Sequence, residues 1–446
     1  MKDQKNTIPS ERRSCRFIIA AVATVAGAAL LAAVPEVSGV TMAQSLDRLV
    51  TITYTLADAP AVVTVDVQTN ATGGTWVSIG GEAVWNATGD VWKKVETGAR
   101  TITWRPDLSW PDHKVADGGA RAVVTAWALD NTPDYMAVDI SSAAQPNTQT
   151  YYPAADFVPG GVTNGLYKTT MLLMRKIMAK DVKWTMGSVA ESGRNTSREG
   201  THQVTLTNNY YFGVYPVTQT QWQLITGYNP SNFTSENTMR PVEKVSYTDV
   251  RQGKGTASAA ATATGGVYPA EPYGDSFLGL LRRKTELDFD LPSDAQWEFA
   301  ARAGHGEGYW GDGSPIQISS KKDTNLDKLG RYQFNGGKTG TDSNTNPAAN
   351  CGVANGTAIV GSYAPNSWGL YDVHGNVWEH CLDCFADNIS SLNGAVNTAS
   401  GTDRARRSGS WNNAATYCRS ACRYNFSPTG RSADVGLRVA CTAGLR

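Results

Sequence analysis

The sequence has little charge and no net charge. Of its 446 residues 18% are charged, below the roughly 25% of ordinary domains, and 40 Lys and Arg balance 40 Asp and Glu. A chain without a basic excess lacks the field that holds nucleic-acid phosphates, so we expect no nucleic-acid partner. The composition also excludes a disordered chain, a collagen and a coiled coil, and the length predicts two or three domains.

Several catalytic signatures are missing. The chain has no Walker loop, no zincin pair and no nucleophile elbow, and it has only five histidines. Residues 306–311 match a dinucleotide-binding pattern but follow an expected helix instead of a strand, and residues 342–353 begin like an EF-hand loop but end unlike one. His374 and His380 give only a weak metal signal. General hydrolase and phosphoryl-transfer functions therefore lack the residues they need.

Cysteine is scarce before the last quarter of the chain. Apart from Cys15, the cysteines are Cys351, Cys381, Cys384, Cys418, Cys422 and Cys441. In an exported protein an even set predicts up to three disulfide bonds, whose connectivity stays open. A zinc site built on the same cysteines is the alternative.

The N-terminus carries an export signal. Three arginines within residues 12–16 precede an apolar run over residues 17–34, and small residues follow. This order is typical of a secretory signal peptide, so we predict that residues 1–43 are removed by cleavage after Ala43. An uncleaved membrane anchor is the alternative, because the run just reaches the length of a membrane span. With the signal removed we expect no membrane span, and a location outside the cytoplasm: periplasmic, secreted or at the cell surface.

Residues 44–145 are expected to form a β-sandwich domain. Runs of β-branched residues separated by turn residues cover positions 50–56, 61–67, 75–79, 100–104 and 122–127. Several short strands without a helical pattern are typical of the immunoglobulin or fibronectin III type. Residues 146–165 are rich in Pro, Gly and Asn and are expected to be a linker, and residues 166–446 form the next domain.

The second domain mixes a few well-marked helices with long loops. Thr218 and Ser293 are each followed three residues later by Gln, a capping-box pattern that predicts helices over residues 219–226 and 294–303. A third helix is expected over residues 276–284. The fold class is therefore α+β, with loops that need metals or disulfides to hold them.

Seven motifs of this domain occur in a recognisable order. They cover residues 184–188, 211–218, 240–247, 291–302, 369–379, 408–412 and 435–438. Together they resemble the formylglycine-generating enzyme family, the sulfatase-modifying factor domain. The resemblance implies a loop-rich C-type lectin-like fold and, as activity, the oxidation of a sulfatase cysteine to formylglycine with O₂ and Cu(I). Its implied partner is a sulfatase.

One segment, residues 369–379, has the residues of a calcium site. Asp372 and Glu379 supply carboxylate oxygens, and a turning backbone at Gly375 and Val377 could add carbonyl oxygens, the ligands that Ca²⁺ prefers. A capped turn with surface carboxylates is the alternative. The resemblance implies that these four residues hold one of the family's calcium ions.

The copper site departs from the family pattern. Active family enzymes carry two cysteines five positions apart after the Gly409-Ser410 step. The second falls on Cys418, but Asn413 stands in place of the first, and Asn is a poor ligand for Cu(I). Cys418 and Cys422 are therefore the candidate catalytic residues, with a different spacing, and copper binding stays open.

The alternative function is a non-catalytic, lectin-like module that binds a protein or glycan ligand from a β-sandwich stalk. The missing cysteine favours it. Residues 412–434 are also rich in types reached by altering adenines in Asn codons, as in related binding proteins diversified by retroelements. The expected ligand-binding surface comprises Trp411, Asn412, Asn413, Arg419, Arg423 and Tyr424, although pairing of the two arginines with carboxylates is also consistent with the sequence.

Overall fold

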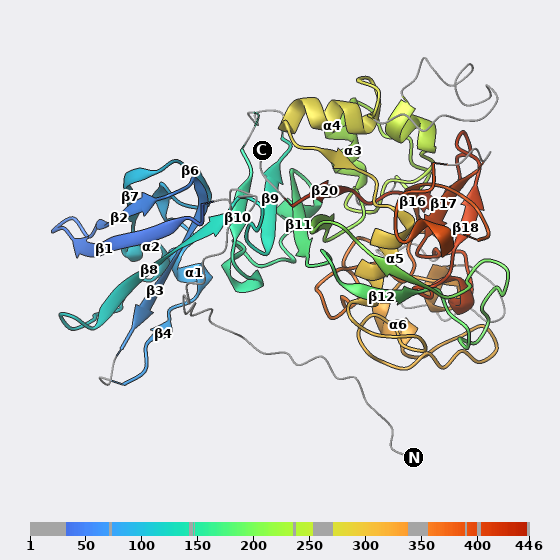
Figure 1. Cartoon of the computed structure of the whole chain (residues 1–446), viewed down its shortest axis with the longest axis horizontal. Coiled ribbons are helices and arrows are strands. Elements are labelled where there is room, and N and C mark those ends of the chain that lie inside the picture. Colours follow the sequence, from blue (N-terminus) through green and yellow to red (C-terminus); the bar gives the residue numbers. More distant parts are fainter. Residues whose placement is uncertain are drawn as a thin grey trace, which may run out of the picture.

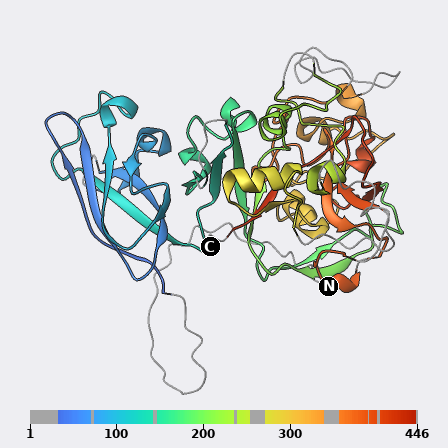
Figure 2. The same cartoon turned by 90° about the horizontal axis from the view of Figure 1, so that it is seen from above.

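The computed structural model describes residues 33–70, 74–141, 146, 148–234, 238–252, 271–337, 356–388, 390–398 and 403–443. The chain is sheet-rich with few helices. Figure 1 shows the N-terminal strands at one end, strands β9, β10 and β11 in the middle, and helices α3 to α6 with the C-terminal strands at the other end. Figure 2 shows the same division from above.

Two sheets form the N-terminal part. One has the strand order β1-β2-β7-β5, and in the other β3 pairs with β8 on one edge and with β4 and β6 on the opposite edge. The strands are β1 (Glu36–Gln44), β2 (Val50–Ala57), β3 (Ala61–Thr69), β4 (Val77–Ser78), β5 (Thr88–Gly89), β6 (Lys93–Val95), β7 (Gly98–Trp104) and β8 (Ala120–Ala128). All five predicted strands are present, β4 as a shorter one. The immunoglobulin or fibronectin III type stays a prediction.

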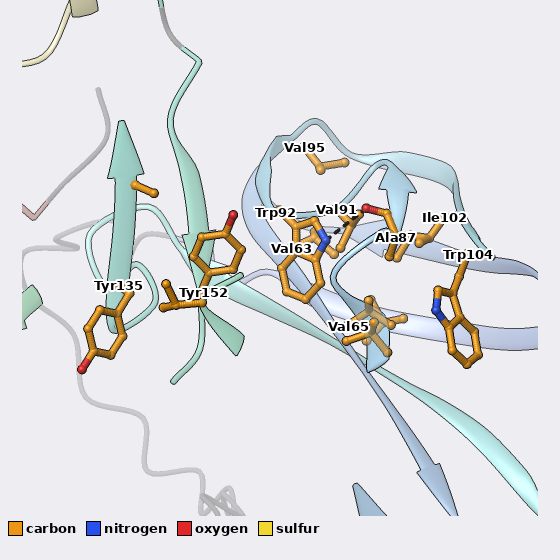
Figure 3. Close-up of a cluster of buried hydrophobic side chains, with 14 of the residues drawn as sticks. Val63, Val65, Ala87, Val91, Trp92, Val95, Ile102, Trp104, Tyr135 and Tyr152 are labelled. Atoms are coloured by element: carbon orange, nitrogen blue, oxygen red, sulfur yellow. Dashed lines mark hydrogen bonds between the residues drawn. The ribbon is translucent and has the colours of Figure 1, made fainter. Parts of the chain in front are cut away.

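Apolar side chains between these sheets form a core that continues into the rest of the chain. β2 alternates buried and exposed positions, because successive side chains of a strand point to opposite faces. Two short helices that the sequence pattern did not show, α1 (Gly81–Val84) and α2 (Pro106–Ser109), lie beside this core. The Trp92 indole donates a hydrogen bond to the Ala87 carbonyl at 3.2 Å, and its ring centroid lies 5.7 Å from that of Tyr152 (Figure 3).

Tyr152 belongs to a six-stranded antiparallel sheet with the order β10-β9-β11-β14-β20-β15. Its strands are β9 (Tyr135–Asp139), β10 (Thr150–Tyr152), β11 (Met171–Ile177), β14 (Tyr210–Gly213), β15 (Phe289–Asp290) and β20 (Ala440–Thr442). β9 comes from the expected sandwich domain and β10 from the expected linker. The expected boundary at residue 145 therefore falls between β9 and β10, which pair with each other, and the boundary at residue 165 falls between β10 and β11 of the same sheet. The 146–165 segment thus contributes a strand to this sheet.

Among the described residues, another four-stranded sheet and the four helices α3 to α6 build the C-terminal part. The sheet has the order β18-β17-β16-β19, and a separate hairpin joins β12 to β13. These strands are β12 (Lys183–Met186), β13 (His202–Thr205), β16 (Trp378–Cys384), β17 (Arg404–Arg407), β18 (Tyr424–Phe426) and β19 (Val435–Gly436), and a short helix α6 (Leu326–Leu329) lies nearby. The capping boxes at Thr218 and Ser293 are both formed, at the start of α3 (Gln219–Thr226) and α5 (Asp294–Arg302). The third helix is α4 (Phe277–Thr285), one residue later than predicted.

The predicted cleavage site conflicts with the first sheet. Most of the expected signal peptide lies outside the described residues. β1 pairs antiparallel with β2 from Glu36 to Gln44, so cleavage after Ala43 would remove nearly the whole strand. Within the described part of the chain, no helix is both long enough and apolar enough to cross a membrane.

The predicted disulfide bonds are not formed among the cysteines that the structure describes. Cys381, Cys384, Cys418, Cys422 and Cys441 are all free thiols, and all are buried. Cys351 lies outside the described residues. Buried side-chain hydrogen bonds and ion pairs connect several of the described loops, such as those of Arg419 with Glu191 and Glu199.

Candidate functional site

The loop after β17 carries the residues that the family resemblance assigns to catalysis. Ser408 and Gly409 turn the chain there with φ angles of 89° and 70°. A Cβ atom on Gly409 would lie 2.8 Å from the Cys418 Sγ atom, closer than real side chains approach. Glycine at this position therefore allows the backbone to cover the Cys418 thiol.

His374 fixes the backbone of Cys418. Its Nε2 accepts a hydrogen bond from the Gly311 N–H at 2.9 Å, so the ring proton lies on Nδ1, which donates to the Cys418 carbonyl at 3.0 Å. Burial lowers the pKa of His374 to about 4, which keeps the ring neutral. His380 is also buried and lies 3.1 Å from the Val245 carbonyl through Nε2. Both histidines bind backbone groups in this fold.

The candidate catalytic cysteines are neutral thiols inside the protein. Cys418 has no exposed surface and Cys422 is 4% exposed. Burial, and then the neighbouring Cys422, raises the pKa of Cys418, and burial raises the pKa of Cys422 to about 12. Cu(I) binds thiolates, so these thiols would have to lose their protons in a buried site before they could hold it.

Asn413 occupies the position of the family's first copper cysteine. Its Oδ1 accepts a hydrogen bond from the Ser410 hydroxyl at 2.5 Å, and its carbonyl accepts one from the Gln333 N–H at 2.9 Å. An amide oxygen is a hard ligand and Cu(I) is a soft ion. Asn413 and Cys418 therefore do not fit a copper centre, and we derive no copper chemistry from them.

Glu379, one of the four expected calcium ligands, is already paired. The Arg438 Nη2 lies 2.8 Å from its Oε1, and the Trp297 indole donates to its Oε2 at 2.6 Å. All three side chains are completely buried. A cation bound by Glu379 would therefore have to compete with the Arg438 guanidinium.

The other expected calcium ligands lie on the turn before β16. Asp372 accepts hydrogen bonds from the Gly361 N–H at 2.7 Å and from the Asn376 amide at 3.2 Å. Burial raises the pKa of Asp372 to about 6. Gly375 and Val377 are buried on the same turn, Gly375 with φ 132°. The turn is capped by hydrogen bonds, as in the alternative, but its two carboxylates are buried and do not lie on the surface, and the calcium site stays a prediction.

Arg419 and Arg423 are not part of an exposed ligand-binding surface. They are 1% and 2% exposed and belong to a buried cluster of charges. The cluster pairs Arg302, Arg407, Arg419 and Arg423 with Glu191, Glu199, Asp294 and Glu298. Removal of one partner from such a pair costs about 3–5 kcal/mol, because the other charge is left buried. The alternative of pairing with carboxylates is therefore confirmed for both arginines.

The remaining residues of the expected surface are half-buried. The Trp411 indole donates to the Ala433 carbonyl at 3.0 Å, and its ring packs edge-on against Phe233 at 5.2 Å. Tyr424 packs against Trp378 at 6.0 Å. Asn412, beside Trp411, is also half-buried. These side chains border the loop, but much of their surface is used in packing.

A polar cavity that sequence reasoning missed lies beside the buried charge cluster. It has a volume of about 340 Å³, and its walls include Arg198, His202, Asp387 and Arg423. Only Arg423 was a predicted site residue. Arg198 lies between β12 and β13 and His202 begins β13, and nothing in their local sequence distinguishes them from ordinary surface residues.

Comparisons with known proteins agree with the motifs. The family model of the sulfatase-modifying factor enzyme 1-like domain matches residues 172–443. The formylglycine-generating enzyme of Streptomyces coelicolor is 34% identical over 163 residues, 35% of this chain and 47% of that protein. The inactive C-alpha-formylglycine-generating enzyme 2 of Mus musculus is 31% identical over 162 residues, 34% of this chain and 43% of that protein. The chain thus spans about half or less of these relatives.

A longer match is to the chaperone protein LppX of Paenibacillus barcinonensis, 28% identical over 241 residues, 52% of this chain and 80% of that protein. Among solved structures, Treponema denticola variable protein 1 aligns with a TM-score of 0.44 at 25% identity, over 61% of this chain and 96% of that chain. PvdO from Pseudomonas aeruginosa aligns with a TM-score of 0.43 at 24% identity, over 60% of this chain and 94% of that chain. Because the family model matches more than half of the sequence, the chain belongs to the family with a sulfatase-modifying factor enzyme 1-like domain.

Proposed function

We propose that this chain is a binding protein of its family and does not carry out the copper-dependent oxidation. The observation that carries the proposal is Asn413. It occupies the position of the first copper cysteine, and its side chain is engaged with Ser410. The buried, neutral state of Cys418 supports the proposal. A relative whose name describes it as inactive is 31% identical to this chain, which adds support.

The competing function is a formylglycine-generating oxidase that acts on a sulfatase and uses Cys418 and Cys422. One observation favours it: Cys422 is close enough to Cys418 to contribute to the raised pKa of its thiol, and neither cysteine is bonded to another. Both functions are compatible with the family, so the experiment has to separate them.

Cu(I) titration under reducing conditions, against a competing chelator, tests the proposal. We expect no tight binding by the unaltered protein and no change in the mass of a sulfatase-motif peptide under oxygen. Asn413→Cys restores the family spacing and should increase Cu(I) affinity, which makes it the matched positive control. Tight binding by the unaltered protein that Cys418→Ser abolishes, together with peptide oxidation, would overturn the proposal.

The site of action is proposed to be outside the cytoplasm. The support is the run over residues 17–34 behind three arginines. Since β1 begins at Glu36, we expect the mature chain to start at or before this residue. Mass spectrometry of the mature N-terminus checks this, and a start at Gln44 would contradict it. The ligand is proposed to be a protein or a glycan, and calcium at Asp372 and Glu379 stays a hypothesis that rests on the resemblance.

A further inference from the structure

The cavity of about 340 Å³ has the size of a small-molecule site and polar walls. Arg198 and His202 belong to one lining segment, residues 196–202, whereas Asp387 and Arg423 come from later parts of the chain. Residues with hydroxyl groups, among them Ser197, also line it. A ligand that fits these walls carries several polar groups of its own.

Arg198 is the cation best placed to bind such a ligand. Its guanidinium lies over the Tyr424 ring at 4.5 Å and over the Phe385 ring at 5.2 Å. Its Nε lies 3.4 Å from the Asp387 Oδ1, while its Nη1 is buried and has no hydrogen-bond partner among the described residues. A stacked guanidinium has already lost much of its freedom, so binding to it orders little more.

His202 offers a second unused group. Its Nδ1 lies 3.3 Å from the Gly200 carbonyl, which can only accept a hydrogen bond, so the ring proton belongs on Nδ1. Its Nε2 is buried and, within the described part of the chain, has no partner. In this tautomer Nε2 accepts, and a hydroxyl group of a ligand can donate to it.

Arg423 has a different role in the wall. Its Nε donates to the Asp294 Oδ2 at 2.7 Å, and its Nη1 donates to the backbone carbonyls of Arg198 at 3.2 Å and of Ala386 at 3.0 Å. These bonds balance its charge and connect the backbone at Arg198 with the backbone at Ala386, next to Asp387. Arg423 therefore positions Arg198 and leaves Arg198 to face a ligand.

We propose that this cavity binds a small hydroxylated ligand with one anionic group, a carboxylate or a sulfate ester, which Arg198 holds in place of Asp387. The Asp387 side chain is 60% exposed, so it can turn into solvent when the ligand enters. Ligand hydroxyls then face His202 and Ser197. This inference deepens the proposed binding role, but it does not depend on whether the chain binds copper.

Calorimetric titration with D-glucuronate, inorganic sulfate and D-glucose tests the site. We expect saturable binding of glucuronate, or of both anions, and none of glucose. Arg198→Gln should weaken binding at least about tenfold, because a charge-assisted hydrogen bond is lost. Asp387→Asn should strengthen binding up to about fivefold, since it removes the competing carboxylate. The two substitutions thus act in opposite directions.

Arg283→Gln, on the exposed side of α4, is the matched control and should leave binding unchanged. Binding of sulfate without glucuronate would assign the site to an inorganic anion or a sulfate ester. Binding of glucuronate without sulfate would assign it to a sugar acid. No saturable binding of either anion up to about 20 mM, or binding that Arg198→Gln does not weaken, would overturn the proposal. Either result would leave the copper experiment, and with it the proposed function, unaffected.

Discussion

The substitution Glu243→Gln should change how the stability of this protein depends on pH. Glu243 is completely buried. Its Oε1 accepts hydrogen bonds from the N–H groups of Asn232 and Phe233, whereas its Oε2 has no partner among the described residues. Burial raises the pKa of Glu243 from 4.5 to about 7. The folded state therefore favours the protonated carboxyl group.

The sign and size of the effect follow from this shift. Below pH 4.5 the carboxyl group is protonated in both states, and stability is not reduced. As the pH rises, the unfolded chain ionises first, so the free energy of unfolding falls until the pH passes the folded pKa near 7. The loss is about 1 kcal/mol at pH 5 and about 3 kcal/mol at pH 8. Glutamine keeps the accepting oxygen and does not ionise, so this pH-dependent loss should disappear.

Urea unfolding at pH 5 and pH 8 measures the difference. Between these values the unaltered protein should lose about 2 to 3 kcal/mol more than Glu243→Gln does. Glu96→Gln, at a side chain that is 66% exposed, is the matched control and should behave like the unaltered protein. Burial also raises the pKa values of Asp372 and Asp383, to about 6 and about 7, but these groups act equally in all three proteins. An identical pH dependence in Glu243→Gln would refute the reasoning.

Three further predictions concern stability. Ser293→Ala removes the N-cap of α5 and should lower the free energy of unfolding by about 1 kcal/mol, measured by urea unfolding; no change would contradict the capping role. Arg438→Met leaves Glu379 buried without its cation and should lower the free energy of unfolding by about 3–5 kcal/mol. The double variant Arg438→Met with Glu379→Gln should recover part of this loss, and an equal loss in the single and the double variant would argue against the pair. The calcium hypothesis predicts that removal of calcium with EDTA lowers the melting temperature by more than about 2 °C, and an unchanged melting temperature would agree instead with the pairing of Glu379 by Arg438 and Trp297.

The three longer helices, α3, α4 and α5, could be predicted because their signals are local. In α3 and α5 the capping residue and its glutamine partner lie three positions apart, and both capping boxes formed as expected. The five runs of β-branched residues likewise marked strands. The period of a strand does not specify its partner, however: residues 135–139 fell within the predicted sandwich domain without being predicted as a strand, whereas β9 there pairs with β11.

The candidate site was harder to predict because its contacts are not local. Arg419 bonds to Glu191, 228 positions earlier in the chain, and Arg423 bonds to Asp294, 129 positions earlier. From sequence alone an arginine on a loop-rich segment could face solvent or a distant carboxylate. Cleavage after Ala43 stays a prediction: small residues mark the site locally, whereas the pairing of β1 with β2, which such cleavage would remove, depends on the folded sheet.

The buried charge cluster determines which residue can report on ligand binding. Four arginines and four carboxylates face one another in it, so the guanidinium of Arg423 is already neutralised by Asp294. A substitution there would unbalance the cluster and destabilise the fold, whatever the cavity binds. Arg198 is different, because its ion pair with Asp387 is partly exposed and contributes at most about 1 kcal/mol. Its charge is therefore available to a ligand, and its substitution tests binding without unfolding the protein.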